Sequence, residues 1–255
     1  MYANAVVSLY PSFTDSNNLD GTFPSELGAL TSLEVIAMNK NSIRGELPVE
    51  LCRLLYLETL ELSYNALEGI PTCIGVLTAL ELLFLSNNMM TGSLPQGIRT
   101  LTSLEGIMVD RNLLTGMVTN LFDDLVNLKW LHLEANDFSG TITDDFLANQ
   151  SKLLQVDLSS NSFEGSFPLH FFTAIPELLV LDLHDNLLSK FFPEPILQNN
   201  NLRVLAIQQN KMTGSLPTTI SNLQALVHLD GTTFQSPATD RLCSFGSSHR
   251  VSLFL

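Results

Sequence analysis

The sequence predicts a solenoid of the α/β class, in which stacked repeats each supply one short strand to a parallel sheet. Three observations over the 255 residues lead to it: one motif recurs at a nearly fixed interval, apolar and polar residues alternate within the motif, and no linker-like segment divides the chain. A unit of about 24 residues cannot bury its apolar side alone, so neighbouring units must stack and close a continuous core.

The interval is marked by asparagine. Nine of them recur every 23 to 25 residues: Asn17, Asn41, Asn65, Asn88, Asn112, Asn136, Asn161, Asn186 and Asn210. The second unit reads Leu33-x-x-Ile36-x-Met38-x-x-Asn41-x-Ile43-x-Gly45-x-Leu47-Pro48, and the other units share this frame. A glycine follows the asparagine by four residues except in the eighth unit, where Lys190 stands, and the third unit is one residue short, so that Pro71 arrives early.

Each element of the frame has a physical role. The apolar positions represented by Leu33, Ile36 and Met38 point inward, and the segment between them alternates in and out as a strand does. The asparagine lies where the chain turns after that strand. Its amide offers donors and an acceptor to backbone groups that would otherwise be orphaned, at about 1–3 kcal/mol each. The glycine relaxes a tight backbone step, and the proline ends the strand-like pairing.

This frame, LxxLxLxxNxLxGxLPxxL, resembles the plant-type leucine-rich repeats of the L domain-like proteins over residues 17–229. The resemblance implies a right-handed, horseshoe-shaped solenoid with a parallel sheet on the concave side and 3₁₀ or irregular structure on the convex side. It also implies a role, because receptor-kinase ectodomains and polygalacturonase-inhibiting proteins of this class hold a peptide, protein or glycan against the concave face.

We expect three segments along the chain. Residues 1–16 form a degenerate N-terminal cap, residues 17–229 form about nine units plus the start of a tenth, and residues 230–255 form a degenerate C-terminal cap or a truncated tail. The start has no basic n-region, and no stretch is long and apolar enough for a membrane helix. The protein is therefore expected to be cytosolic or to lack its true N-terminus, whereas the resemblance favours an extracellular or cell-surface location.

Charge and cysteine content narrow the expected partners. The 26 acidic and 12 basic residues give a net charge of −14, which disfavours nucleic acid and anionic membranes. We expect a monomer that binds a protein or peptide, with a glycan as the alternative. Cys52, Cys73 and Cys243 are an odd number without a Cys-x-x-Cys pair, so neither a disulfide framework nor a zinc motif is predicted. We expect ordinary buried or half-exposed thiols.

Ligand contacts are expected at the outward positions of the predicted strands, because the inward positions are committed to the core. Aligning the units brings together apolar and aromatic residues beside acidic ones, a composition typical of interaction hot spots. The predicted ligand-binding residues are Leu82, Phe84, Met108, Asp110, Trp130, His132, Glu134, Asp157, Asp182, His184 and Asp185. The alternative is that these are the isolated apolar residues and family-typical aspartates that any such surface carries.

No catalytic chemistry is predicted. The sequence has no G-x-S-x-G, H-E-x-x-H, P-loop or kinase motif, so we expect no catalytic residue, no cofactor and no metal. Glu34, Glu58, Glu81 and Glu105 form one ladder, which we interpret as a solvated acidic rim because a hard cation requires converging ligands. A metal at His184 with Asp182 and Asp185 is the weaker interpretation of those side chains.

The sequence therefore predicts a non-catalytic binding module, either receptor-ectodomain-like or a secreted recognition protein. The alternative is a structural, adhesive or scaffold protein of a wall or matrix, whose regular face works by repetition. Such a surface should repeat its outward residues, and these columns vary, which favours recognition.

Overall fold

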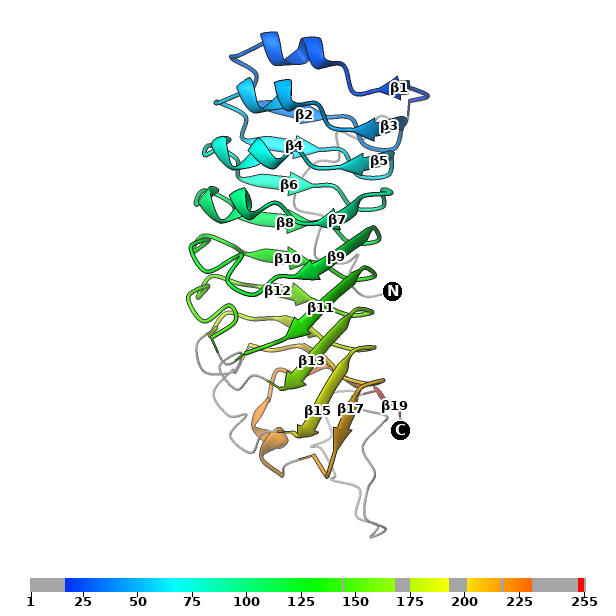
Figure 1. The fold of residues 1–255 in the computed structure, drawn as a ribbon. Helices are drawn as coiled ribbons and strands as arrows, with labels where there is room; N and C mark the ends of the chain where they lie inside the picture. The colour runs from blue at the N-terminus through cyan, green and yellow to red at the C-terminus, as the bar shows by residue number, and fades with distance from the viewer. Residues whose placement is uncertain are drawn as a thin grey trace.

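The computed structural model describes residues 17–143, 145–167, 175–192, 201–216, 218–230 and 252–254. The predicted N-terminal cap and nearly all of the C-terminal segment, Cys243 included, lie outside the described residues. Within them the units stack in sequence order along one axis, from β1 at the N-terminal end to β17 and β18 at the other (Figure 1).

Each unit from the second to the tenth contributes a three-residue strand to the concave sheet, Ser252–Phe254 adds a further strand, and all neighbouring strands are parallel. Its ten strands are β2 (Val35–Ala37), β4 (Thr59–Glu61), β6 (Leu82–Phe84), β8 (Gly106–Met108), β10 (Trp130–His132), β12 (Gln155–Asp157), β14 (Val180–Asp182), β16 (Val204–Ala206), β18 (His228–Asp230) and β19 (Ser252–Phe254). Up to β18 the register pairs the residues in the aligned order of the repeats; Trp130, for example, lies between Gly106 and Gln155. The predicted solenoid with a parallel concave sheet is confirmed.

A second strand follows the asparagine of each unit and forms what we call the lateral strands. β1 (Asp20–Thr22), β3 (Ser42–Glu46) and β5 (Ala66–Gly69) make one sheet, and β7 (Thr91–Ser93), β9 (Leu113–Met117), β11 (Asp137–Thr141), β13 (Ser162–Ser166), β15 (Leu187–Phe191) and β17 (Lys211–Thr213) make another. The lateral strands were not predicted from the amino-acid sequence. Its break falls at the short third unit, where the β3–β5 register shifts between Gly45 and Glu46.

The convex side carries 3₁₀ helices, as expected. They are η2 (Ser25–Ala29), η3 (Val49–Arg53), η4 (Thr72–Val76), η5 (Gln96–Thr100) and η7 (Thr218–Asn222). The first four each follow a proline of the repeat, and proline suits a helix start because its φ is fixed and its missing N–H would have no partner there.

The expectation of unpaired thiols is wrong for two cysteines. Cys52 in η3 and Cys73 in η4 form a disulfide, with an S–S distance of 2.00 Å and a Cα–Cα distance of 6.0 Å. The two residues are 21 positions apart, but stacking places one 3₁₀ turn on the next, within the Cα separation that a disulfide needs. Sequence spacing alone does not show this proximity.

The asparagines form a hydrogen-bonded ladder between the concave and lateral strands. Asn112 donates its Nδ2 protons to the carbonyl oxygens of Leu85, Val109 and Asp110 at 3.0–3.1 Å, and its Oδ1 accepts from the N–H of Met90 at 3.0 Å. Its side chain is buried, and the asparagines from Asn65 to Asn210 bond in the same way. Each rung therefore ties one unit to the unit before it.

The turn into each rung requires a left-handed backbone. The residue before every ladder asparagine from Asn41 to Asn210 has φ between 50° and 59°. Further on, the repeat glycine has positive φ in seven units, and Lys190 takes the same conformation at φ 72° where the glycine is missing. Gly69 of the short third unit is not among the residues with positive φ.

Candidate functional site

The concave sheet has two zones, and the first is apolar. Leu82, Phe84 and Trp130 converge over Gly106, where an added Cβ would lie 3.0 Å from Phe84 Cε1 and 3.3 Å from Leu82 Cδ2 and Trp130 Cε3. These neighbours therefore occupy the space that a side chain at this position would need. Leu82 is only 5% exposed, whereas Phe84 and Trp130 are half-buried. The apolar zone is accordingly a packed platform with two accessible rings rather than a row of free side chains.

Lys129 borders this platform. Its Nζ lies 5.8 Å from the centre of the Trp130 ring and 2.7 Å from Glu105 Oε2. Glu105 is thus the half-buried, paired end of the predicted acidic rim, while Glu34, Glu58 and Glu81 are exposed.

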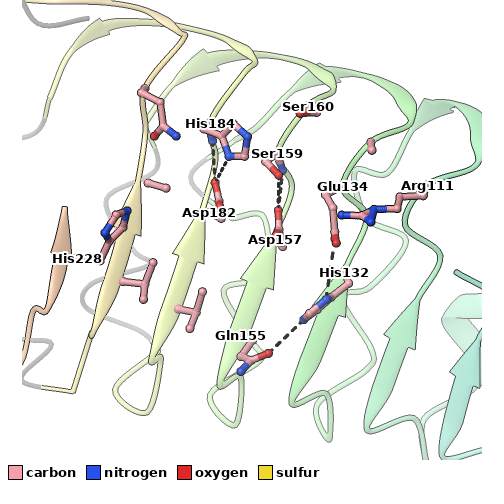
Figure 2. Close-up of a pocket in the computed structure, with 15 residues that line it drawn as sticks. Arg111, His132, Glu134, Gln155, Asp157, Ser159, Ser160, Asp182, His184 and His228 are labelled. Atoms are coloured by element: carbon pink, nitrogen blue, oxygen red, sulfur yellow. Dashed lines mark hydrogen bonds and ion pairs between the residues drawn. The ribbon is translucent and has the colours of Figure 1, made fainter. Parts of the chain in front are cut away.

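The second zone is a polar hollow of about 330 Å³ that crosses the strands from β10 to β18 (Figure 2). Its lining comprises Arg111, His132, Glu134, Ala135, Gln155, Asp157, Ser159, Ser160, Val180, Asp182, His184, Val204, Ala206, Gln208 and His228. Five of the eleven predicted ligand-binding residues line it, namely His132, Glu134, Asp157, Asp182 and His184. The other six, Leu82, Phe84, Met108, Asp110, Trp130 and Asp185, lie outside the lining.

Sequence reasoning missed several residues of this hollow. Gln155, Gln208 and His228 stand in the same aligned columns as the predicted residues, so a search of those columns for hydrogen-bonding side chains would have found them. Burial also differs from the outward-facing expectation: Met108, Asp110 and His132 are at most 9% exposed. The reason is that side chains of adjacent strands cover one another on the concave side.

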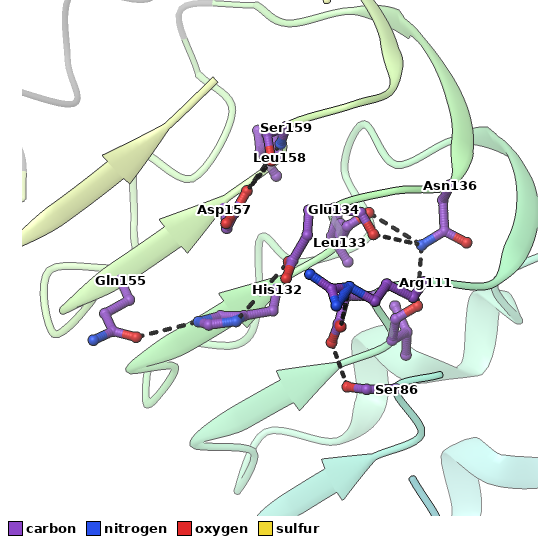
Figure 3. Close-up of polar contacts among 12 residues, drawn as sticks. Ser86, Arg111, His132, Leu133, Glu134, Asn136, Gln155, Asp157, Leu158 and Ser159 are labelled. Carbon is purple, nitrogen blue, oxygen red and sulfur yellow. Dashed lines mark hydrogen bonds and ion pairs between the residues drawn. The ribbon is translucent and has the colours of Figure 1, made fainter. Parts of the chain in front are cut away.

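Most polar groups in the hollow pair with a neighbour (Figures 2 and 3). His184 Nδ1 lies 2.6 Å from Asp182 Oδ1, and Asp157 Oδ1 accepts from Ser159 Oγ at 2.6 Å. His132 Nε2 lies 3.2 Å from Gln155 Oε1. These contacts fix the directions of the imidazole rings and of two carboxylates.

Two buried oxygen atoms of the lining have no hydrogen-bond partner among the residues that the structure describes. They are Glu134 Oε2 and Gln208 Oε1, and Asp230 Oδ1 on β18 is a third such atom. Glu134 Oε2 lies 3.9 Å from His132 Nδ1, which is too far for a hydrogen bond. Burying a polar atom without a partner costs free energy.

The hollow also perturbs its titrating groups. Burial raises the pKa of Glu134 to about 9, and the charges of Asp157 and Asp110 add to the shift. Burial, followed by the charge of Asp182, raises the pKa of Asp157 to about 7. Burial lowers the pKa of His132, whereas the hydrogen bond to Asp182 raises the pKa of His184. At neutral pH Glu134 is therefore protonated and His132 is neutral.

Among the described residues, no group of three or more His, Cys, Asp or Glu side chains is arranged to hold a metal ion. None of the helices in that part of the chain has the length and apolar character to cross a membrane.

Comparisons with known proteins agree with this architecture. Residues 12–167 match the family model described as a leucine-rich repeat region. No curated protein matches the sequence. The plant peptide hormone receptor RGFR1, solved in complex with RGF2, is 33% identical with a TM-score of 0.83, over 86% of this chain and 35% of that one.

Two other solved structures are informative. The Arabidopsis receptor kinase HAESA, in complex with the peptide hormone IDA and the co-receptor SERK1, is 30% identical with a TM-score of 0.81, over 86% of this chain and 37% of that one. A plant ice-binding protein is 29% identical with a TM-score of 0.75, over 84% of this chain and 67% of that one. The chain thus spans little more than a third of the length of the receptor chains it matches.

Proposed function

This chain belongs to the leucine-rich-repeat proteins, and from that membership we propose that it is a non-catalytic recognition module that binds a peptide or protein on its concave sheet. The observation that carries the proposal is the polar hollow beside the apolar platform, both built from side chains that vary from unit to unit. Apolar anchors next to buried polar groups are typical of recognition surfaces.

The similar structures support a peptide ligand. RGFR1 and HAESA are described in complex with peptide hormones, and both are at least 30% identical to this chain. An extended peptide has the length to contact both zones, because parallel strands lie about 4.8 Å apart and Trp130 and His132 belong to the same strand. The aromatic rings of Phe84 and Trp130 would anchor such a peptide at one end, and the hollow would receive its polar groups.

The disulfide supports an extracellular setting for this role. A Cys52–Cys73 bond persists in secreted or cell-surface proteins and is rare in the reducing cytosol. Mass spectrometry of the protein isolated from its native source should find the two cysteines joined.

The test is selection of ligands on the purified chain from a displayed library of random peptides, in parallel with a glycan array. We expect enriched peptides whose binding falls at least about tenfold in Trp130→Ala, because aromatic anchors dominate such interfaces. Phe191→Ala is the matched control, since Phe191 is 73% exposed on the lateral strand β15. Enriched peptides that bind both variants equally would contradict the proposal, and enrichment of glycans alone would make the ligand a glycan.

A structural or adhesive role needs a face that repeats. On the lateral strands Ser93 pairs with Thr115, but Asp137 follows in the same column. Ser139 pairs with Ser162 on one side and with Met117 on the other. The described lateral strands therefore lack the uninterrupted array that a lattice-binding surface would use, and recognition remains the function that the side chains favour.

A further inference from the structure

We propose that the hollow binds a positively charged side chain of the ligand, an arginine or lysine of a peptide, between Glu134 and Asp157. The inference rests on the proposed function and deepens it, because it names the chemical class of the group that the concave sheet recognises.

The charges of the hollow are unbalanced. Its carboxyl groups are Glu134, Asp157 and Asp182. Asp182 has a close basic partner, His184, at 2.6 Å, whereas Glu134 lies 3.9 Å from His132, whose pKa is lowered by burial. Arg111 is the one arginine or lysine in the lining, and its side chain is 58% exposed at the rim and 3.9 Å from Asp110. Asp157 lies directly opposite Asp182 in the sheet, an arrangement that is unfavourable for like charges. A cation at Glu134 and Asp157 would relieve it.

The buried polar atoms that lack a hydrogen-bond partner among the described residues also favour a cationic ligand group. Once Glu134 is ionised, the unpartnered atoms found buried among the described residues of the concave face, Glu134 Oε2, Gln208 Oε1 and Asp230 Oδ1, are all acceptors. The Glu134 side chain is 13% exposed and belongs to the lining of the hollow. A guanidinium carries five N–H donors and an ammonium carries three, with no acceptor in either. A basic side chain therefore supplies what the lining lacks, and an acidic one would not.

Binding of this cation is coupled to protons. Burial and the surrounding carboxylates raise the pKa of Glu134 to about 9 and that of Asp157 to about 7, so Glu134 is protonated and Asp157 partly protonated at neutral pH. The charged or titrating groups that face the pair are Asp110, Arg111, His132, Asp182 and His184. An arriving cation favours the ionised carboxylates, so protons leave as it binds and the affinity rises with pH.

The experiment uses the full chain and a matched pair of blocked tripeptides, acetyl-Gly-Arg-Gly-amide and its citrulline counterpart. Citrulline keeps the shape and most donors of arginine but carries no charge. Binding is followed by NMR of the imidazole rings of His132 and His184, both of which line the hollow. We expect saturable shifts with the arginine peptide, at least about tenfold tighter at pH 8 than at pH 6, and no saturation with citrulline at the same concentrations.

Variants locate the site. Glu134→Gln and Asp157→Asn keep the size of the side chains and remove their charges, and each should weaken the arginine peptide about tenfold. Glu164→Gln, an exposed carboxylate on lateral strand β13, should leave binding unchanged. If Glu134→Gln does not fold, Asp157→Asn and the pH series on the unmodified chain still decide the question.

The overturning results are equally definite. Equal responses to arginine and citrulline, no response at all, or arginine binding that both hollow variants retain would each refute a cation site. The proposed function fails by a different result, the absence of any enriched peptide. If the enriched peptides lack basic residues and bind the Glu134→Gln and Asp157→Asn variants as tightly as the unmodified chain, the recognition function is supported and the cation site is refuted.

Discussion

The concave and lateral sheets are built from the same repeats, yet they respond differently to a missing residue. The concave register pairs Thr59 with Leu82 and Leu82 with Gly106 without interruption across the short third unit. The lateral layer divides at that unit, between β5 and β7. The third unit lacks one residue after its asparagine rung. The deletion therefore changes neither the ladder nor the concave strand, which both precede it in the unit.

This difference shows where the fold tolerates variation in the length of a unit and in its side chains. Asn88 still accepts from the Leu67 N–H at 3.0 Å and donates to the Leu62 carbonyl at 3.0 Å, so the rung beside the short unit is intact. The concave columns therefore keep fixed spacings while their side chains change, which is what a recognition surface requires. The lateral layer absorbs the irregularity instead.

The ladder should be the common support of both sheets, and removing a rung should give the largest effect. Asn112→Ala would orphan the Met90 N–H and weaken three carbonyl contacts in a buried turn. We expect a loss of about 3–5 kcal/mol in the free energy of unfolding, measured by urea denaturation. Asn127→Ala removes two exposed hydrogen bonds, one donated to the Thr102 carbonyl and one accepted from Lys152 Nζ, and should cost about 1 kcal/mol or less. Equal losses would mean that the ladder has no special role.

The disulfide should stabilise the convex side next to the divided layer. Replacing Cys52 and Cys73 with serine reopens a loop between residues 21 positions apart, and we expect a loss of about 3 kcal/mol. Reductant should lower the urea midpoint of the unmodified chain toward that of the variant and leave the variant unchanged. A reductant effect of the same size on both proteins would contradict this assignment.

The hollow should make the concave sheet sensitive to pH. The folded-state pKa of Glu134, about 9, lies above its ordinary value of 4.5, so only the unfolded state ionises as the pH rises between the two. The unfolded state then binds fewer protons, and stability falls with rising pH. We expect Glu134→Gln to lessen the decline between pH 5 and pH 8 by about 1–3 kcal/mol. A decline as steep as that of the unmodified chain would show that Glu134 titrates normally.

A lateral position offers the smallest effect, and its sign is opposite. Lys190 has φ 72° where other units have glycine. Because left-handed backbone costs a side-chain-bearing residue about 1–2 kcal/mol, Lys190→Gly should stabilise the protein by about 1 kcal/mol in thermal unfolding. Lys211→Gly in β17 removes an exposed lysine whose φ is not positive, and should destabilise it by about 0.5–1 kcal/mol. A loss in both variants would refute the strain at Lys190.

The repeat, the concave strands and their register could be predicted from the amino-acid sequence. Each of these follows from spacing along the chain: the asparagine interval gives the unit, the alternation around Ile36 and Met38 gives the strand, and stacking equal units gives the columns. The 3₁₀ turns after Pro48 and Pro71 were expected only from the resemblance to plant-type leucine-rich repeats, not from the spacing.

The contacts between side chains of neighbouring units, by contrast, became known only from the folded stack. The Cys52–Cys73 bond, the covering of Gly106 by Phe84 and Trp130, and the unpartnered Oε2 of Glu134 all arise between residues that the stack brings together. Their proximity depends on how closely neighbouring side chains pack, which no interval encodes. The burial of each side chain shows that the predicted binding surface consists of two parts, the apolar platform and the polar hollow.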